Sequence, residues 1–193
     1  TTINQTLGAT LSAGEAVLAV PNNDGTKARV ITFKPNSTQY IAYQFDGNGY
    51  TGTSVVSNAS SANVNHSNGT LRLSPDGKKI LSLSALATGG TGILREFTFD
   101  ASSGLLFENW NIAIPAVPLI GTMAYGVDYS PSGNYVFVSG QGGTAKVFRY
   151  NISGGSILST QLDVTATTNL GTGGGQILRG PDGKMYVANT GAT

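Results

Sequence analysis

The chain has 193 residues and a formal net charge of +1, and only 11% of its residues are charged, against roughly 25% in an average soluble protein. So few basic residues exclude a surface built to neutralise nucleic-acid phosphates, and no apolar run reaches the roughly 20 residues of a membrane-spanning helix. Cysteine is absent, which excludes disulfides, thiolate catalysis and cysteine-based zinc sites.

Taken in chain order, a short motif recurs at intervals of about fifty residues, each time between two apolar runs. Its marker glycines are spaced by 52, 56 and 50 residues, and they are Gly25, Gly77, Gly133 and Gly183. In the last three copies a proline stands two positions earlier, at Pro75, Pro131 and Pro181. Proline fixes φ near about −65°, the Asp or Ser after it bonds back to the backbone, and glycine supplies a positive φ. The motif therefore predicts a tight hairpin turn, with structural roles for these glycines and prolines.

A second motif follows each of the first three turns. It consists of an aromatic residue, then Asp or Asn, then Gly a few positions on, and its aromatics are Phe45, Phe99 and Tyr150. This second hairpin gives each repeat four antiparallel strands, and four-stranded units repeated at such a period are the signature of a β-propeller. A two-sheet sandwich is disfavoured, because its strands would show no comparable self-similarity.

The repeats predict the boundaries of the blades. We expect residues 1–14 to hold the outer strand of a preceding blade and residues 175–193 to form an incomplete one. Whole blades are expected over residues 15–58, 70–114 and 124–165, the last with a strand from 157 to 164. About three and a half blades favour a piece of a larger propeller, and a small closed ring of four blades is the alternative.

Residues with catalytic chemistry are few. Five of the seven aspartates fall in predicted turns, and His66 is the only histidine, in what we expect to be a polar connection between blades. No cofactor-binding motif is complete, so we predict no cofactor and no metal site. An enzyme of the lactonase or lyase type would need a metal in the central channel or His66 as a base.

The predicted connections between blades, and those between second and third strands, are long and polar. They should all lie at one end of the propeller, opposite the short proline-containing turns. Loops on a rigid scaffold commonly carry binding residues. The candidate binding residues at this end are Asn65, His66, Tyr125, Gln141 and Gln176.

Several segments, in their order along the chain, resemble a family of large Bacteroidetes cell-surface proteins described as gliding-motility-associated or PKD-domain proteins. The matching segments are residues 28–35, 54–58, 73–80, 97–104, 125–131 and 176–188. Propeller-like regions of that family show the same succession of segments. The resemblance covers nearly the whole chain. It implies export through the type IX secretion system, attachment outside the outer membrane, and an adhesive or binding role.

We therefore expect a secreted, non-enzymatic propeller that binds a protein or a glycan at the cell surface. A surface supplied by 40 Ser and Thr residues, 27 Gly and 15 Asn in place of charged residues agrees with an extracellular protein. Neither nucleic acid nor membrane insertion is expected. Two alternatives stay open, namely the lactonase- or lyase-like enzyme and a structural spacer domain.

Overall fold

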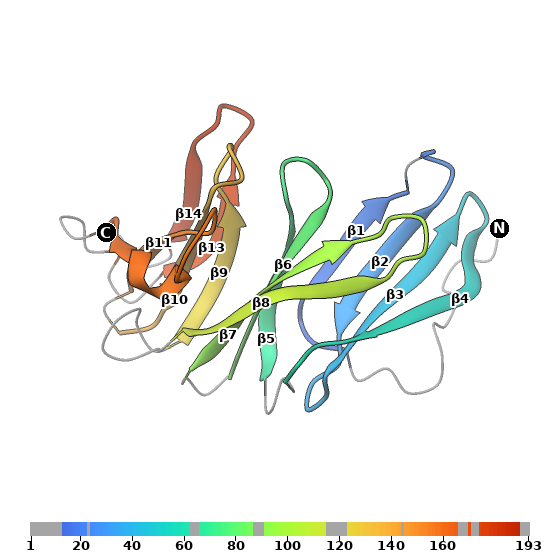
Figure 1. The fold of residues 1–193 in the computed structure, drawn as a ribbon, viewed down its shortest axis with the longest axis horizontal. Helices are drawn as coiled ribbons and strands as arrows, with labels where there is room; N and C mark the ends of the chain where they lie inside the picture. The colour runs from blue at the N-terminus through green and yellow to red at the C-terminus, as the bar shows by residue number, and fades with distance from the viewer. Residues whose placement is uncertain are drawn as a thin grey trace.

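Figure 1 shows the computed structural model of the chain, which describes residues 13–22, 24–61, 66–86, 91–114, 123–143, 145–165, 170 and 174–189. At residues 66, 67 and 86 it describes the backbone alone. The expected outer strand within residues 1–14 lies almost wholly outside the described residues.

Four antiparallel sheets follow one another along the chain, and sequential strands are neighbours within each sheet. Sheet 1 contains β1(Val17–Pro21), β2(Ala28–Phe33), β3(Gln39–Asp46) and β4(Gly49–Asn58). Sheet 2 contains β5(His66–Leu73), β6(Lys79–Leu86), β7(Gly92–Phe99) and β8(Leu106–Ile114). Sheet 3 contains β9(Met123–Tyr129), β10(Tyr135–Gln141), β11(Val147–Asn151) and β12(Leu162–Asp163), and sheet 4 contains β13(Gly174–Arg179) and β14(Met185–Asn189).

The first strand of every sheet is the innermost one. Strand β5 contacts both β1 and β9, and β9 also contacts β13, so these four strands gather along a common line. These contacts place the sheets in chain order around that line, and Figure 1 shows sheets 1, 2 and 3 side by side in this order. This radial order of four-stranded meanders is that of a β-propeller, and the predicted fold class is confirmed.

Side-chain alternation fills the space between sheets. Successive residues of a strand point to opposite faces. Ile80 accordingly joins a buried cluster between sheets 1 and 2, while its neighbour Leu81 joins a second cluster between sheets 2 and 3. Both side chains are fully buried. Sheet 2 thus contributes apolar side chains to the contact with each of its two neighbours.

The turn joining the first two strands has the same construction in each sheet. Its glycine takes a positive φ, of +70° at Gly25, +73° at Gly77, +75° at Gly133 and +77° at Gly183. In sheet 2 the amide of Gly77 donates to the carbonyl of Ser74 at 3.0 Å, and the Asp76 side chain accepts from the amide of Lys78 at 3.2 Å. A β-carbon on Gly133 would lie 3.8 Å from Pro75, and one on Gly183 would lie 3.8 Å from Pro131. Successive turns are therefore neighbours at one end of the sheets.

The fourth strand of sheet 3 differs from expectation. In place of a strand over residues 157–164, the chain forms a 3-10 turn at Ile157–Thr160, and only the two residues of β12 pair with β11. The reason is local hydrogen bonding by hydroxyl side chains. Thr160 donates to the carbonyl of Ile157 at 2.7 Å and accepts from the amide of Asn151 at 2.8 Å. Such bonds compete with a strand ladder for the backbone groups.

Replacing Gly77 by Ala is expected to destabilise the protein by about 1–2 kcal/mol, because a β-carbon strains a left-handed backbone conformation. Nothing lies within 4 Å of the added carbon, so strain is the main cost. The matched control is Gly47→Ala, where the space is equally open and φ is not in the left-handed range. Urea unfolding of both variants checks the difference, and equal free energies of unfolding would contradict it.

Asp100 generates a pH-dependent prediction at the second kind of turn. It accepts hydrogen bonds from the hydroxyls of Ser102 and Ser103, both at 2.6 Å, and from the amide of Ser102 at 2.9 Å. The Ser102 and Ser103 hydroxyls, with that amide, lower the pKa of Asp100 to about 2. A depressed pKa adds stability above the ordinary value of about 3.9, and this stability is lost as the pH falls towards 2. Asp100→Asn should therefore lose less free energy of unfolding between pH 4 and pH 2 than the wild type, as followed by urea titration at each pH. Equal losses in the two proteins would show that these bonds do not favour the carboxylate.

Candidate functional site

Three inner strands carry a register irregularity near the end where the connections between blades begin. The register shifts by one residue between His66 and Asn68 in β5, at Tyr125 in β9, and between Gly174 and Ile177 in β13. A bulge leaves a residue without a ladder partner and changes the direction of its side chain. Two of the predicted binding residues, Tyr125 and Gln176, stand at these irregularities.

The side chains gathered there form what we call the axis cluster, which consists of Glu15, Thr70, Arg72, Tyr125 and Gln176. The Tyr125 hydroxyl donates to Glu15 Oε1 at 3.2 Å. Thr70 Oγ1 lies 2.9 Å from Gln176 Oε1 and 3.0 Å from the carbonyl oxygen of Tyr125. Arg72 Nη2 donates to Gln176 Oε1 at 3.4 Å. These residues come from all four sheets or the segments next to them.

A close approach of two inner strands makes this convergence possible. Gly126 of β9 has no side chain, and a β-carbon there would lie 2.6 Å from the backbone nitrogen of Ile177 in β13. Strand β13 therefore lies directly against β9. As a result, Gln176 of sheet 4 reaches Thr70 of sheet 2 past the intervening sheet.

A small cavity of about 190 Å³ opens beside the cluster. Its lining includes the charged residues Glu15 and Arg72 together with the polar residues Thr70 and Gln176. Within the described part of the chain, Arg72 Nε is buried and has no hydrogen-bond acceptor. The nearest carboxylate, on Asp128, is 3.9 Å away. The cavity thus has one carboxylate, one guanidinium and uncharged donors and acceptors.

The Tyr125 hydroxyl is electrostatically coupled to this cavity. Burial raises the pKa of Tyr125 first, and the Glu15 carboxylate raises it further by charge repulsion and by accepting the hydroxyl proton. A hydrogen bond from the Gln176 side chain opposes the rise in pKa. Tyr125 is therefore a neutral hydrogen-bonding group over the physiological pH range, not a base.

The other predicted binding residues are Asn65, His66 and Gln141. Asn65 lies outside the described residues, and at His66 the structure describes the backbone alone. His66 was expected in a loop, but it is the first residue of β5 and pairs with Leu86, because β5 extends further towards the connection than the apolar pattern indicates. Gln141 ends β10 opposite Met123, at the same end of the sheet as Tyr125.

Sequence reasoning missed Glu15, Thr70 and Arg72. Thr70 and Arg72 lie immediately before and after Leu71 in a strand recognised only for its apolar residues. Because adjacent strand residues point to opposite faces, polar residues on either side of a buried leucine are the signal that could have identified this second face.

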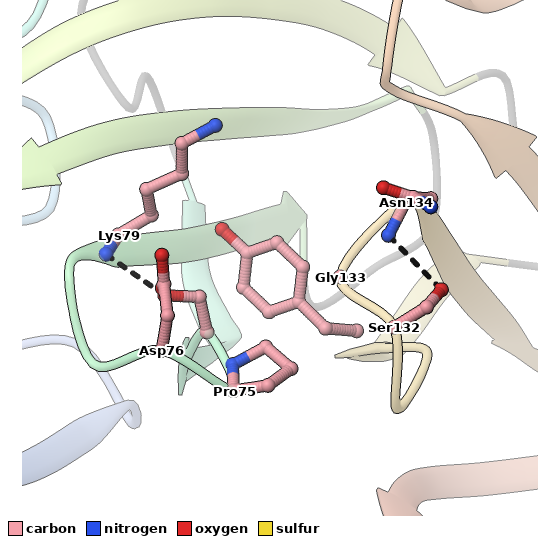
Figure 2. Close-up of a pocket in the computed structure, with 8 residues that line it drawn as sticks. Pro75, Asp76, Lys79, Ser132, Gly133 and Asn134 are labelled. Atoms are coloured by element: carbon pink, nitrogen blue, oxygen red, sulfur yellow. Dashed lines mark hydrogen bonds between the residues drawn. The ribbon is translucent and has the colours of Figure 1, made fainter.

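A second cavity, of about 220 Å³, lies at the opposite end of the sheets, between the turns of sheets 2 and 3. Figure 2 shows Pro75, Asp76 and Lys79 on one side of it and Ser132, Gly133 and Asn134 on the other. Its polar groups already have partners. Asp76 accepts from Ser74 Oγ at 2.6 Å, Ser132 Oγ from the amide of Asn134 at 3.3 Å, and Lys79 Nζ lies 3.0 Å from the buried Glu96 carboxylate. We therefore regard this cavity as a product of turn packing.

Within the described residues, little supports a metal site or a membrane-spanning helix. They contain no group of three or more His, Cys, Asp or Glu side chains that could hold a metal ion. Nor does any helix within them have the length and apolar character needed to span a membrane.

Comparison with known proteins supports the fold and does not indicate a specific function. No protein-family model and no curated protein matches the chain. It is similar to the structure of hydrazine synthase from Kuenenia stuttgartiensis, with 17% identity, a TM-score of 0.57, and 89% of this chain and 49% of that one covered. It is also similar to a proposed 6-phosphogluconolactonase from Bacteroides uniformis ATCC 8492, with 16% identity, a TM-score of 0.54 and coverage of 91% and 46%. A third similar structure is the PQQ domain of pyranose dehydrogenase from Coprinopsis cinerea, with 12% identity, a TM-score of 0.56 and coverage of 93% and 44%. The chain thus spans about half the length of each of these solved chains.

The coupling between Glu15 and Tyr125 is testable. Replacing Glu15 by Gln removes the negative charge beside the phenol, so the pKa of Tyr125 should fall towards its ordinary value while burial keeps it raised. Titration of ¹³Cζ-labelled tyrosines by NMR measures this, and Tyr125→Phe assigns the signal. An unchanged pKa of Tyr125 in the Glu15→Gln variant would show that the two side chains do not meet.

Proposed function

We propose that this chain is a non-catalytic binding module that holds a hydroxyl-rich group of a glycan at the axis cluster. The observation that carries the proposal is the convergence of Glu15, Thr70, Arg72 and Gln176 on one cavity, with Tyr125 hydrogen-bonded to Glu15 at its edge. Carboxylate and amide oxygens accept hydrogen bonds from sugar hydroxyls, while the guanidinium and the amide nitrogen donate to sugar oxygens.

The size of the cavity bears on the ligand. Pockets for drug-sized ligands enclose about 300–1,000 Å³, and the cavity beside the axis cluster measures about 190 Å³. It therefore suits one sugar ring at the end or side of a larger glycan. A single ring gives modest affinity, and adhesive proteins reach higher avidity through multiple copies.

A binding role agrees better with these side chains than an enzymatic one. A hydrolytic propeller needs a general base or a metal-bound water. The hydroxyl of Tyr125 stays protonated because its pKa is raised, and the guanidinium of Arg72 only donates hydrogen bonds and has no accepting atom. Glu15 is the one carboxylate of the axis cluster, and it already accepts a hydrogen bond from Tyr125.

Location at the cell surface belongs to this same proposal. It is supported by the resemblance of the segments to the gliding-motility-associated proteins and by the abundance of Ser, Thr, Asn and Gly. Labelling of intact source cells with an antibody against this chain tests it, and labelling only after lysis would contradict it.

The binding proposal is tested with an array of immobilised glycans, followed by calorimetry with the best ligand. Gln176→Ala should weaken binding about three- to tenfold, because one net hydrogen bond is worth about 0.5–1.5 kcal/mol. The matched control is Gln141→Ala, at the same end of the sheets but outside the cluster, and its affinity should be unchanged. No glycan binding, equal effects of both variants, or turnover of sugar lactones would contradict the proposal.

A further inference from the structure

A guanidinium is buried between sheets 1 and 2 with no charged partner. Arg29 of β2 is 5% exposed. Its Nη2 donates to the carbonyl oxygen of Ser102, in the turn between β7 and β8, at 3.1 Å. Within the part of the chain that the structure describes, Arg29 makes no salt bridge, and its Nη1 is buried without a hydrogen-bond acceptor. A buried charge is costly unless a counterion or further hydrogen bonds compensate it.

The position of Arg29 in the repeat makes this charge exceptional. It stands in the second strand of its sheet, one ladder step inward from the pair that adjoins the first turn. The equivalent residues of sheets 2 and 3 are Leu81 and Phe137. An apolar side chain therefore satisfies the packing at this position in both of these sheets. The arginine of sheet 1 is better explained by what its charge attracts than by the needs of the fold.

The turn between β7 and β8 holds the guanidinium in a fixed place. Besides accepting the hydrogen bond at Ser102, this turn brings Gly104 against the side chain. A β-carbon on Gly104 would lie 3.1 Å from Cζ and Nε of Arg29 and 3.3 Å from its Nη1, so a larger residue there would crowd the guanidinium. The charge is thus preorganised, and a preorganised group loses less conformational entropy when it binds a ligand.

A cavity of about 210 Å³ lies beside Arg29, and we call it the Arg29 cavity. Arg29 is one of its lining residues, and the others are Asn22, Asp24, Lys27, Gln44, Ala101 and Ser102. The Asp24 carboxylate is engaged in its own turn, where Oδ1 accepts from the amide of Thr26 at 2.8 Å. The side-chain nitrogens of Lys27 and Gln44 have no hydrogen-bond partner among the described residues. The cavity therefore offers unused donors, and its two cations and one carboxylate leave one positive charge in excess.

We propose that the Arg29 cavity binds a singly charged oxyanion group, that is, a carboxylate or a sulfate monoester. One negative charge balances the positive charge in excess among the lining side chains. Oxygen atoms of such a group accept hydrogen bonds from Lys27 and Gln44, while their charge compensates the buried guanidinium. A phosphate monoester carries nearly two charges at neutral pH, so the Asp24 carboxylate at the same cavity disfavours it.

The Arg29 cavity is separate from the axis cluster. Most of its lining comes from the first turn of sheet 1 and the second turn of sheet 2, at the end of the sheets opposite to the connections between blades. The proposed glycan site can therefore fail while this anion site stands. Two sources supply the ligand chemistry, namely a free small acid and an acidic sugar unit of a polysaccharide.

NMR titration of the ¹⁵N-labelled chain at constant ionic strength tests the proposal. Sodium methyl sulfate, sodium acetate and methyl β-D-glucuronide should each shift the amide signals of Lys27, Gln44 and Ser102 to saturation. The uncharged methyl β-D-glucoside should not, and methyl phosphate, at a pH where it is a dianion, should bind more weakly than methyl sulfate. Tighter binding of the glucuronide than of acetate would assign the acidic sugar as the source, and equal affinities would assign the free acid.

Two variants remove the cations of the cavity. Arg29→Leu places in sheet 1 the residue that sheet 2 has at this position, so the fold should persist, and it should weaken the binding of each anion at least about tenfold. Lys27→Gln should weaken it about two- to fivefold, the loss expected for one exposed ion pair. Because Lys27 is exposed, this second variant keeps the test valid if Arg29→Leu does not fold.

The matched control is Lys78→Gln, which removes the same charge from an exposed turn of sheet 2 outside the cavity and should leave the affinities unchanged. The proposal is overturned if the three anions give no saturable shifts or if methyl phosphate binds more tightly than methyl sulfate. An unchanged affinity in Arg29→Leu, or equal weakening by Lys27→Gln and Lys78→Gln, also overturns it.

Discussion

The burial of both faces of each sheet is the constraint on which the structure depends. A sheet whose apolar residues all lie on one face can pack against one neighbouring sheet. Sheet 2 packs against two, so the adjacent residues Ile80 and Leu81 are both apolar and face opposite sides. The same constraint limits where polar residues stand. Buried polar residues have specific partners: the Tyr40 hydroxyl lies 2.8 Å from Ser82 Oγ of the next sheet, and the buried Arg95 donates at 2.9 Å to Ser61, in the connection between sheets 1 and 2.

Much of the fold could be predicted from the sequence, because turns are local. The glycine of each turn, its Asp or Ser and, in the last three turns, its proline lie within four residues, and their conformations follow from their own chemistry. Because the turn recurs about every fifty residues, each repeat is long enough for four strands with their connections and for little more. Sheet 3 shows the limit of this reasoning, since Ile157–Thr160 has the composition of a strand, yet the hydroxyl of Thr160 takes the backbone partners that a strand would use.

The candidate site was predictable only in part, because its contacts join residues that are far apart along the chain. Tyr125 and Gln176 were selected for their place near a connection between blades, and the structure brings them to one cluster. Their partners Glu15 and Thr70 are separated from them by 110 and 106 residues. The link depends on a missing side chain at Gly126 and on one-residue shifts of register, and neither leaves a pattern in an isolated strand.

At the bulges of the inner strands, the packing between sheets and the surface offered to a ligand depend on different residues. At an ordinary ladder position, a change of side chain alters the packing between sheets as well as the surface that a ligand meets. Tyr125 and the Gly175–Gln176 step lie outside that regular ladder, so their side chains are free to diversify while the core stays the same. A scaffold of this kind offers a route to altered selectivity, in which a few variable positions near the axis are randomised on an unchanged framework.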